Sequence, residues 1–213
     1  MAAVRAALGF RLHTGWAAVV AVSGQRASVN VLLRKRIELL PGDGSIPRFV
    51  YHAAAEMDAA ASAELVKRAA SGAQKVARSA LTEILEELRQ QGVTVNVAGI
   101  PTGSTAVPSE LAKILGAHPL IHAAEGELFL KAAAGACERC GLNVVTARER
   151  ELWERAAAVD GMDAVRLRRK IDELRQSVGA PWSADQKIAT AAALLALGTT
   201  GVPRGGSRAP STG

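Results

Sequence analysis

The chain has 213 residues, 49% of them hydrophobic and only 3% aromatic, so we expect a core of Ala, Val, Leu and Ile. Two cysteines are too few for a secreted disulfide framework, no signal-peptide layout is apparent, and the apolar run Ile188–Leu197 is too short to cross a bilayer. We therefore expect a cytoplasmic protein without a membrane segment. The formal net charge of +6 permits a nucleic-acid partner.

The first forty residues predict an antiparallel three-stranded meander. Glycines at 15 and 24 mark turns between three apolar runs, namely Ala7–Leu12, Trp16–Val22 and Ser28–Leu39. The third run contains the basic triplet Arg34, Lys35 and Arg36. We interpret this triplet either as charge that protects an exposed edge strand or as a nucleic-acid contact surface.

The next segment contains the clearest helical pattern in the chain. Phe49–Met57 could be a short extended segment that leads into a helix, and Ser62–Gln91 is expected to be a helix with Ser62 as its N-cap. Residues three and four apart form an apolar stripe along it, namely Val66, Ala69, Ala73, Val76, Ala80, Ile84 and Leu88. A strand over Val93–Ile100 and a loop over Pro101–Pro108 follow.

The remaining residues predict further helices around one more strand. A helical region from Ser109 breaks near Gly116, restarts at His118–Pro119 and ends before Gly141. The later elements are a strand at Leu142–Thr146 and helices at Ala147–Ala158, Met162–Val178 and Ala184–Leu197. The order predicts an α/β fold with a mixed sheet and helices on both faces. We expect one domain over residues 1–201 and a disordered tail over 202–213.

Three short sequence segments, taken in this order, resemble those of a known family. They are Leu8–Arg11 with Gly15–Val20, then Ala123–Gly126 running on to Cys140–Val144, and finally Ala184–Leu197 with its leading Asp185. Over residues 6–198 the chain resembles the ribonuclease H-like superfamily, and within it the Holliday-junction resolvases. The resemblance implies a ribonuclease H-like mixed sheet, in which an antiparallel three-stranded meander is followed by βα units.

The resemblance also implies a chemistry that the residues do not support. Resolvases hold two divalent metals with carboxylates from the first strand, the fourth strand and the last helix. Here the first-strand position is occupied by Arg11 or by a neighbour that is also not acidic, and the fourth strand, Val95–Ile100, has no carboxylate. Of the expected metal-binding carboxylates, only Asp185 of the last helix is present. We therefore expect a non-catalytic module that binds nucleic acid or a protein partner. A second copy of this chain is one such protein partner.

The alternative is a divalent-metal-dependent nuclease with a rearranged site. Its candidate catalytic residues are Glu125, Asp185, His122 and His52, and its cofactor is unknown. The candidate nucleic-acid-binding residues are Arg11 and the triplet Arg34, Lys35 and Arg36. We assign no metal ligands from the sequence.

Several motifs have a structural as well as a functional interpretation. His118, His122 and Glu125 could bind Zn²⁺ or act as acid and base, or could form a helix turn with a solvated Glu125 or Glu127.

Cys137 and Cys140 are better explained as small buried hydrophobes than as a zinc or redox pair. The loop Pro101–Thr105 could bind phosphate or simply connect elements. Trp182 is expected to pack rather than stack on a base, and Arg148-Glu149-Arg150-Glu151 to be a solvated helix face.

Overall fold

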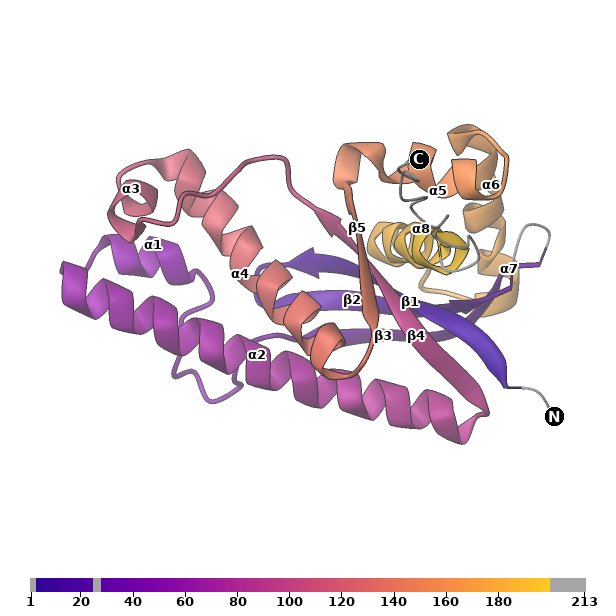
Figure 1. Ribbon diagram of the computed structural model, residues 1–213, viewed down its shortest axis with the longest axis horizontal. Helices are drawn as coiled ribbons and strands as arrows, with labels where there is room; N and C mark the ends of the chain where they lie inside the picture. Colours follow the sequence, from indigo (N-terminus) through magenta and orange to yellow (C-terminus); the bar gives the residue numbers. More distant parts are fainter. Residues whose placement is uncertain (1–2, 25–27, 200–213) are drawn as a thin grey trace, which may run out of the picture.

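The computed structural model describes residues 3–24 and 28–199, so the tail expected over 202–213 lies outside the described residues. One mixed sheet has the strand order β3-β2-β1-β4-β5 (Figure 1). The strands are β1 (Val4–His13), β2 (Trp16–Ser23), β3 (Asn30–Glu38), β4 (Val93–Thr102) and β5 (Asn143–Arg148). The first three pair antiparallel, whereas β4 and β5 run parallel to β1. The predicted meander followed by βα units is confirmed.

The meander forms where the sequence predicted it. Thr14 and Gly15 connect β1 to β2, and Gly15 adopts a φ of 83°, which glycine tolerates best. β3 is an edge strand, so the basic triplet lies at an edge of the sheet.

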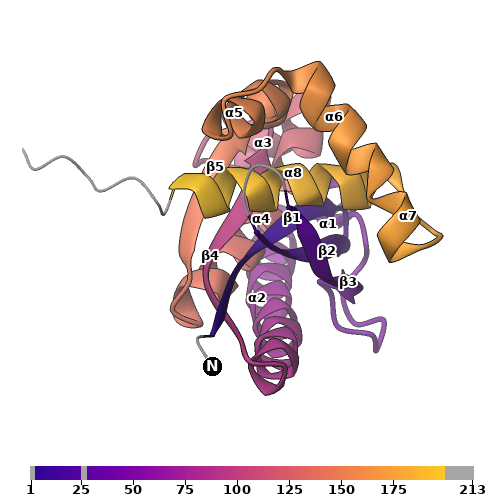
Figure 2. The ribbon, with the colours of Figure 1, turned by 90° about the vertical axis from the view of Figure 1, so that its right-hand side faces the viewer.

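Helices cover both faces of the sheet, as Figures 1 and 2 show. They are α1 (Val50–Ala55), α2 (Ala59–Gln90), α3 (Leu111–Leu115), α4 (His118–Arg139), α5 (Leu152–Val159), α6 (Ala164–Glu173), α7 (Arg175–Val178) and α8 (Ala184–Thr199), with a 3₁₀ turn η1 (Glu149–Glu151). Among the described residues, no helix combines the length and apolarity needed to span a membrane.

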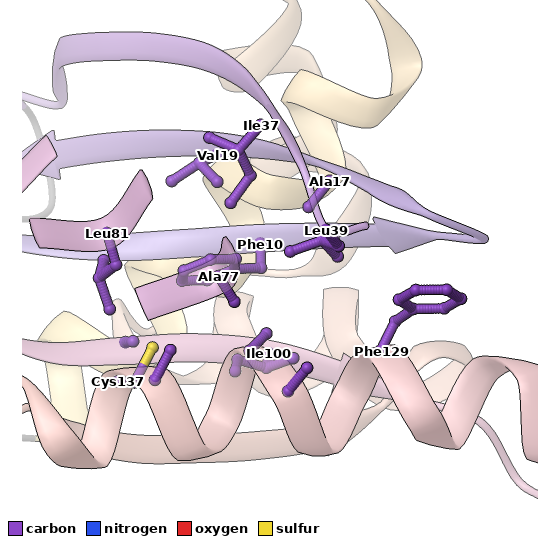
Figure 3. Packing of buried hydrophobic residues seen from close by; sticks show 14 of the residues in the cluster. Phe10, Ala17, Val19, Ile37, Leu39, Ala77, Leu81, Ile100, Phe129 and Cys137 are labelled. Atoms are coloured by element: carbon purple, nitrogen blue, oxygen red, sulfur yellow. The ribbon is translucent and has the colours of Figure 1, made fainter. Parts of the chain in front are cut away.

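Alternating residues of the central strands supply two separate cores. Leu8 and Phe10 of β1 pack with α1, α2 and α4 on one face, where Leu81, Ile100 and Phe129 also lie (Figure 3). Ala7 of β1 and Val20 of β2 belong to the other core, which α5, α6 and α8 complete. This period of two follows from the pleat of a strand that is buried on both sides.

The last helix packs directly onto the backbone of the two central strands. A Cβ atom added to Gly9 would lie 1.8 Å from the carbonyl oxygen of Ala189, and one added to Gly99 would lie 2.0 Å from that of Ala192. The absence of side chains at these two glycines therefore lets α8 approach β1 and β4. This contact positions Asp185, in the first turn of α8, near the end of β1.

The extended interpretation of Phe49–Met57 is wrong, because Val50–Ala55 forms α1. The carboxylate of Glu125 accepts hydrogen bonds from the first-turn N–H groups of Tyr51 and His52, a long-range contact that local sequence does not reveal.

The start of α2 also differs from the expectation. Asp58, not Ser62, is the N-cap, since its side chain accepts a hydrogen bond from the Ala61 N–H. Ser62 lies inside the helix, fully buried, and donates to the Ala54 carbonyl at 2.6 Å. The buried stripe is accordingly rotated and consists of Ser62, Leu65, Ala69, Ala73, Ala77, Leu81, Ile84 and Leu88.

Boundaries in the second half shift by a few residues. β4 continues to Thr102, and β5 runs to Arg148, so the helix expected from Ala147 begins later, as η1 and α5. The helix expected over Met162–Val178 divides into α6 and α7 at Leu174. Parallel pairing of Pro101 with Ala147 and of Thr102 with Arg148 extends the two strands together.

Candidate functional site

The carboxyl ends of β1, β4 and β5 meet at one edge of the sheet, because these three strands run parallel. In α/β sheets this edge is where ligands usually bind. A hollow of about 470 Å³ opens there. It is lined by Arg11, the loop after β4, one face of α4 and Glu149, and its members are Arg11, Leu12, Pro101, Thr102, Gly103, Ser104, Thr105, His122, Ala123, Gly126, Glu127, Leu130, Lys131 and Glu149.

Arg11 lies between two carboxylates at this edge. Its Nη1 donates to Glu149 Oε2 at 2.5 Å, and its Nε lies 3.9 Å from Asp185 Oδ1. That Nε is buried and has no hydrogen-bond partner among the described residues. The same Asp185 oxygen lies 2.8 Å from His13 Nε2. A guanidinium, which keeps its charge at any physiological pH, thus neutralises both carboxylates.

The sequence placed Asp185 near the first strand but missed Glu149. Glu149 belongs to the alternating Arg-Glu stretch that we interpreted as a solvated helix face. The available signal was its position directly after β5, at the same sheet edge as the ends of β1 and β4. That placement depends on strand order, which local charge patterning does not report.

A second hollow, of about 510 Å³, adjoins the first through Thr102–Ser104 and Glu149. It adds three exposed arginines, Arg148, Arg150 and Arg168. The guanidinium carbon of Arg168 lies 4.0 Å from the ring centroid of Trp153. Cations therefore outnumber carboxylates around the two hollows, and one aromatic ring carries a cation on its face.

A second aromatic ring also contacts basic side chains. The guanidinium carbon of Arg36 lies 4.0 Å from the centroid of Trp16, and the His13 ring stacks on Trp16 at 4.1 Å. These contacts join β2 to β1 and β3, so they form only when the sheet folds.

The basic triplet of β3 already has protein partners. Arg34 donates to the carbonyl oxygens of Val178 and Pro181, both at 2.6 Å, and to that of Gly179. Lys35 pairs with Glu87, and Arg36 lies 3.0 Å from Glu38 in addition to its contact with Trp16.

A separate polar cluster forms between α1 and α4. Glu125 is only 3% exposed, and its Oε1 accepts from Tyr51 N at 2.8 Å and from His52 N at 3.3 Å, with His52 Nδ1 at 3.2 Å. The solvated interpretation is therefore wrong for Glu125, whereas Glu127 is half-buried and pairs with Lys131. Burial raises the pKa of Tyr51, and the nearby carboxylates of Glu125 and Glu127 raise it further.

Three histidines converge at this cluster. His52, His118 and His122 each offer a ring nitrogen, and these nitrogens all lie within 4.8 Å of one another. The structure thus brings His52, His122 and Glu125 together. Asp185 comes from α8, which packs on the opposite face of the sheet from α4, and among the described residues no hydrogen bond or ion pair joins it to this cluster.

Two other motifs have structural roles. Cys137 and Cys140 are both free, with Cys137 buried and Cys140 half-buried, as the small-hydrophobe interpretation predicted. Trp182 is 8% exposed, and its Nε1 donates to the Ile171 carbonyl at 2.7 Å, which confirms that it packs.

No protein-family model matches the chain, and no curated protein matches it. Among solved structures, the chain is similar to Thermus thermophilus RuvC, with a TM-score of 0.52, 15% identity and coverage of 92% of this chain and 95% of that one. A structure of T. thermophilus RuvC in complex with a Holliday junction substrate gives the same TM-score, with 14% identity and coverage of 92% and 94%. The fold is therefore ribonuclease H-like, and the distant similarity to Holliday-junction resolvases that the sequence suggested is confirmed.

Proposed function

We propose that this protein is a ribonuclease H-like module that binds nucleic acid at the ends of β1, β4 and β5 and does not cleave it by a two-metal mechanism. The observation that carries the proposal is the Arg11 guanidinium between Glu149 and Asp185. Neither Val4–His13 nor Val93–Thr102 contains Asp or Glu, so these two strands offer no carboxylate to a pair of Mg²⁺ ions. The fixed positive charge of Arg11 would also repel such ions.

Several features of the same edge support the nucleic-acid part of the proposal. Arg148, Arg150 and Arg168 supply exposed positive charge for phosphate groups, and the Trp153 ring supports the Arg168 guanidinium. RuvC, which has the same fold, has been observed with a Holliday junction substrate. We propose branched DNA as the first ligand to test. The proposal includes a cytoplasmic location, where the two free thiols would stay reduced.

The proposed surface retains one of the basic residues expected from the sequence and adds others. Arg11 stays in it as a charge-neutralising group. The contacts of Arg34 with three carbonyl oxygens favour a structural role for that residue. Lys35 and Arg36 lie on an exposed edge, and we propose them as secondary phosphate contacts only.

Fluorescence anisotropy of labelled four-way junction, duplex and single-stranded DNA across a range of salt concentrations tests the proposal. We expect affinity to fall with rising salt, since phosphate binding releases counterions. The triple variant Arg148→Glu/Arg150→Glu/Arg168→Glu should weaken binding at least about tenfold and lower the salt slope by about one per lost phosphate contact.

The matched control is Lys75→Glu/Arg78→Glu/Arg139→Glu, which makes the same charge change at a hollow between α2 and the end of α4. Equal losses of DNA affinity in both triple variants would show that binding depends on net charge and not on a specific site. No binding even at low salt would refute the nucleic-acid proposal. Light scattering of the free protein and of the complexes tests the alternative expectation of a homo-oligomer or protein-binding subunit.

One observation favours a nuclease as the second candidate, because Glu149 and Asp185 both contact Arg11 and therefore lie near the end of β1. Displacement of Arg11 by substrate would leave these carboxylates available to a metal ion. Cleavage of junction, duplex or hybrid substrates with Mg²⁺ or Mn²⁺, abolished by Asp185→Asn, would establish this candidate and refute the non-catalytic proposal.

A further inference from the structure

We propose that His52, His118 and His122 bind a zinc ion and that Glu125 holds His52 in place. His52 comes from α1, whereas His118 and His122 lie four residues apart on α4 and so face the same side of that helix. One ring nitrogen from each lies within 4.8 Å of the others. The inference does not depend on the proposed function, because zinc binding is measured on the protein alone.

The spacing of the three rings suits tetrahedral coordination after small movements. Ring centroids are separated by 4.4 Å for His118 and His122, 4.8 Å for His52 and His122, and 5.7 Å for His52 and His118. A Zn–N bond of about 2.0–2.1 Å places ligand nitrogens about 3.3–3.4 Å apart. His118 and His122 are exposed, so rotation of their side chains can close the difference without moving the backbone.

Glu125 supplies a second and independent indication of a cation. Its Oε1 lies 3.2 Å from His52 Nδ1, which leaves Nε2 of His52 for a metal. A carboxylate behind a histidine in this way commonly orients a zinc ligand. Its Oε2 is buried and has no hydrogen-bond partner among the described residues. A carboxylate so placed is unfavourable without compensating charge, and a divalent cation on His52 would supply it.

The ligand type selects the class of metal. Neutral imidazoles suit Zn²⁺ and similar transition ions, whereas Mg²⁺ and Ca²⁺ prefer oxygen ligands. Three protein ligands leave a fourth coordination position for water, as in zinc sites that are open to other ligands. His122 also lines the first hollow at the strand ends, so the ion would lie at the rim of the proposed nucleic-acid surface. It would also tie α1 to α4.

The experiment uses the untagged full chain, stripped of metal with EDTA and then dialysed. Zn²⁺ is titrated in competition with a chromogenic chelator, and Co²⁺ absorption reports the coordination geometry. We expect one equivalent of Zn²⁺, a tetrahedral Co²⁺ spectrum, and a rise in melting temperature because the ion binds the folded state.

Variants of the proposed ligands identify the site. His118→Ala and His122→Ala should each weaken zinc binding more than about 100-fold, since even outer partners contribute about 10- to 100-fold. Glu125→Gln, a change at a positioning residue, should weaken binding by about that smaller factor and leave the tetrahedral Co²⁺ spectrum in place.

Two variants serve as controls, with circular dichroism to verify folding. His13→Gln removes the one histidine outside the cluster, and Cys140→Ser removes the more accessible thiol; both should bind zinc like the wild type. The proposal fails if the wild type does not compete with the chelator. It also fails if the two α4 variants, still folded, retain wild-type affinity, or if either control loses it.

Discussion

Arg11 at the end of β1 and Glu149 in η1 form an ion pair across 138 residues of sequence. The pair lies at the sheet edge where the family resemblance leads us to expect metal-binding carboxylates. Asp185 contacts the same arginine from α8. One cation thus lies between two acidic groups that would otherwise repel each other, which gives Arg11 a clear electrostatic role.

Replacing Arg11 should create a divalent-metal site. In Arg11→Asn, Glu149 and Asp185 lose their common counter-charge, and carboxylate oxygens are good ligands for Mn²⁺. We expect Mn²⁺ affinity, measured by electron paramagnetic resonance in a His118→Ala background, to rise at least about tenfold, which is about 1.4 kcal/mol. Arg5→Asn, which removes an exposed cation near the start of β1, is the control. Equal Mn²⁺ affinities in the two variants would contradict the prediction.

Because α8 packs so closely on the sheet, we predict that one added methyl group will strongly reduce the free energy of unfolding. Gly9→Ala and Gly99→Ala would each drive a Cβ atom into backbone atoms of α8, at 1.8 and 2.0 Å from a carbonyl oxygen. Overpacking of this kind costs about 1–3 kcal/mol or more, because backbone has to move. Urea denaturation measures the loss. Gly42→Ala, with nothing within 4 Å of the added atom, should be nearly neutral.

Arg34 should affect stability more than nucleic-acid binding. Arg34→Ala removes hydrogen bonds to the Val178 and Pro181 carbonyls, and we expect a loss of about 1–3 kcal/mol in the free energy of unfolding. Lys35→Ala removes an exposed ion pair with Glu87 and should cost less than about 1 kcal/mol. A drop in DNA affinity for Arg34→Ala without loss of stability would assign Arg34 to the binding surface instead.

Cys137 should resist alkylation in the folded protein. Burial raises the pKa of its thiol to about 12, and Cys140 and Glu138 contribute to the increase. At pH 8 only about one molecule in ten thousand would carry the reactive thiolate. Mass spectrometry after iodoacetamide treatment should find Cys140 modified first and Cys137 only after denaturation. Early modification of Cys137 would contradict the predicted burial.

The same shift predicts a pH dependence of stability. The ordinary pKa of the thiol is 9.0, so the unfolded chain ionises Cys137 at a lower pH than the folded chain does. The stabilising contribution is complete below about pH 9 and disappears as the pH rises towards 12. Cys137→Ala should therefore lose less stability than the wild type between these pH values, when both are followed by circular dichroism.

Local patterns were sufficient for most of the elements and insufficient for their precise limits. The Thr14–Gly15 turn and the restart of the helix at His118–Pro119 follow from residue types alone, and both are present. Helix α1 could not be predicted, because the Glu125 carboxylate that binds its first amides lies more than seventy positions away. The true N-cap, Asp58, has a local signal that we missed.

The candidate site likewise combines features that follow from the sequence with features that depend on the tertiary structure. The sequence alone determined the fold, the absence of acidic residues from the first and fourth strands, and the choice of His122 and Glu125 as candidate site residues. Tertiary structure decided that Glu149 joins Arg11, that Asp185 contacts Arg11 and His13, and that His52 completes a cluster with His118 and His122. The physical reason is range: hydrogen bonding and side-chain periodicity act between near neighbours, whereas an ion pair or a ligand cluster depends on which elements the packed cores bring together.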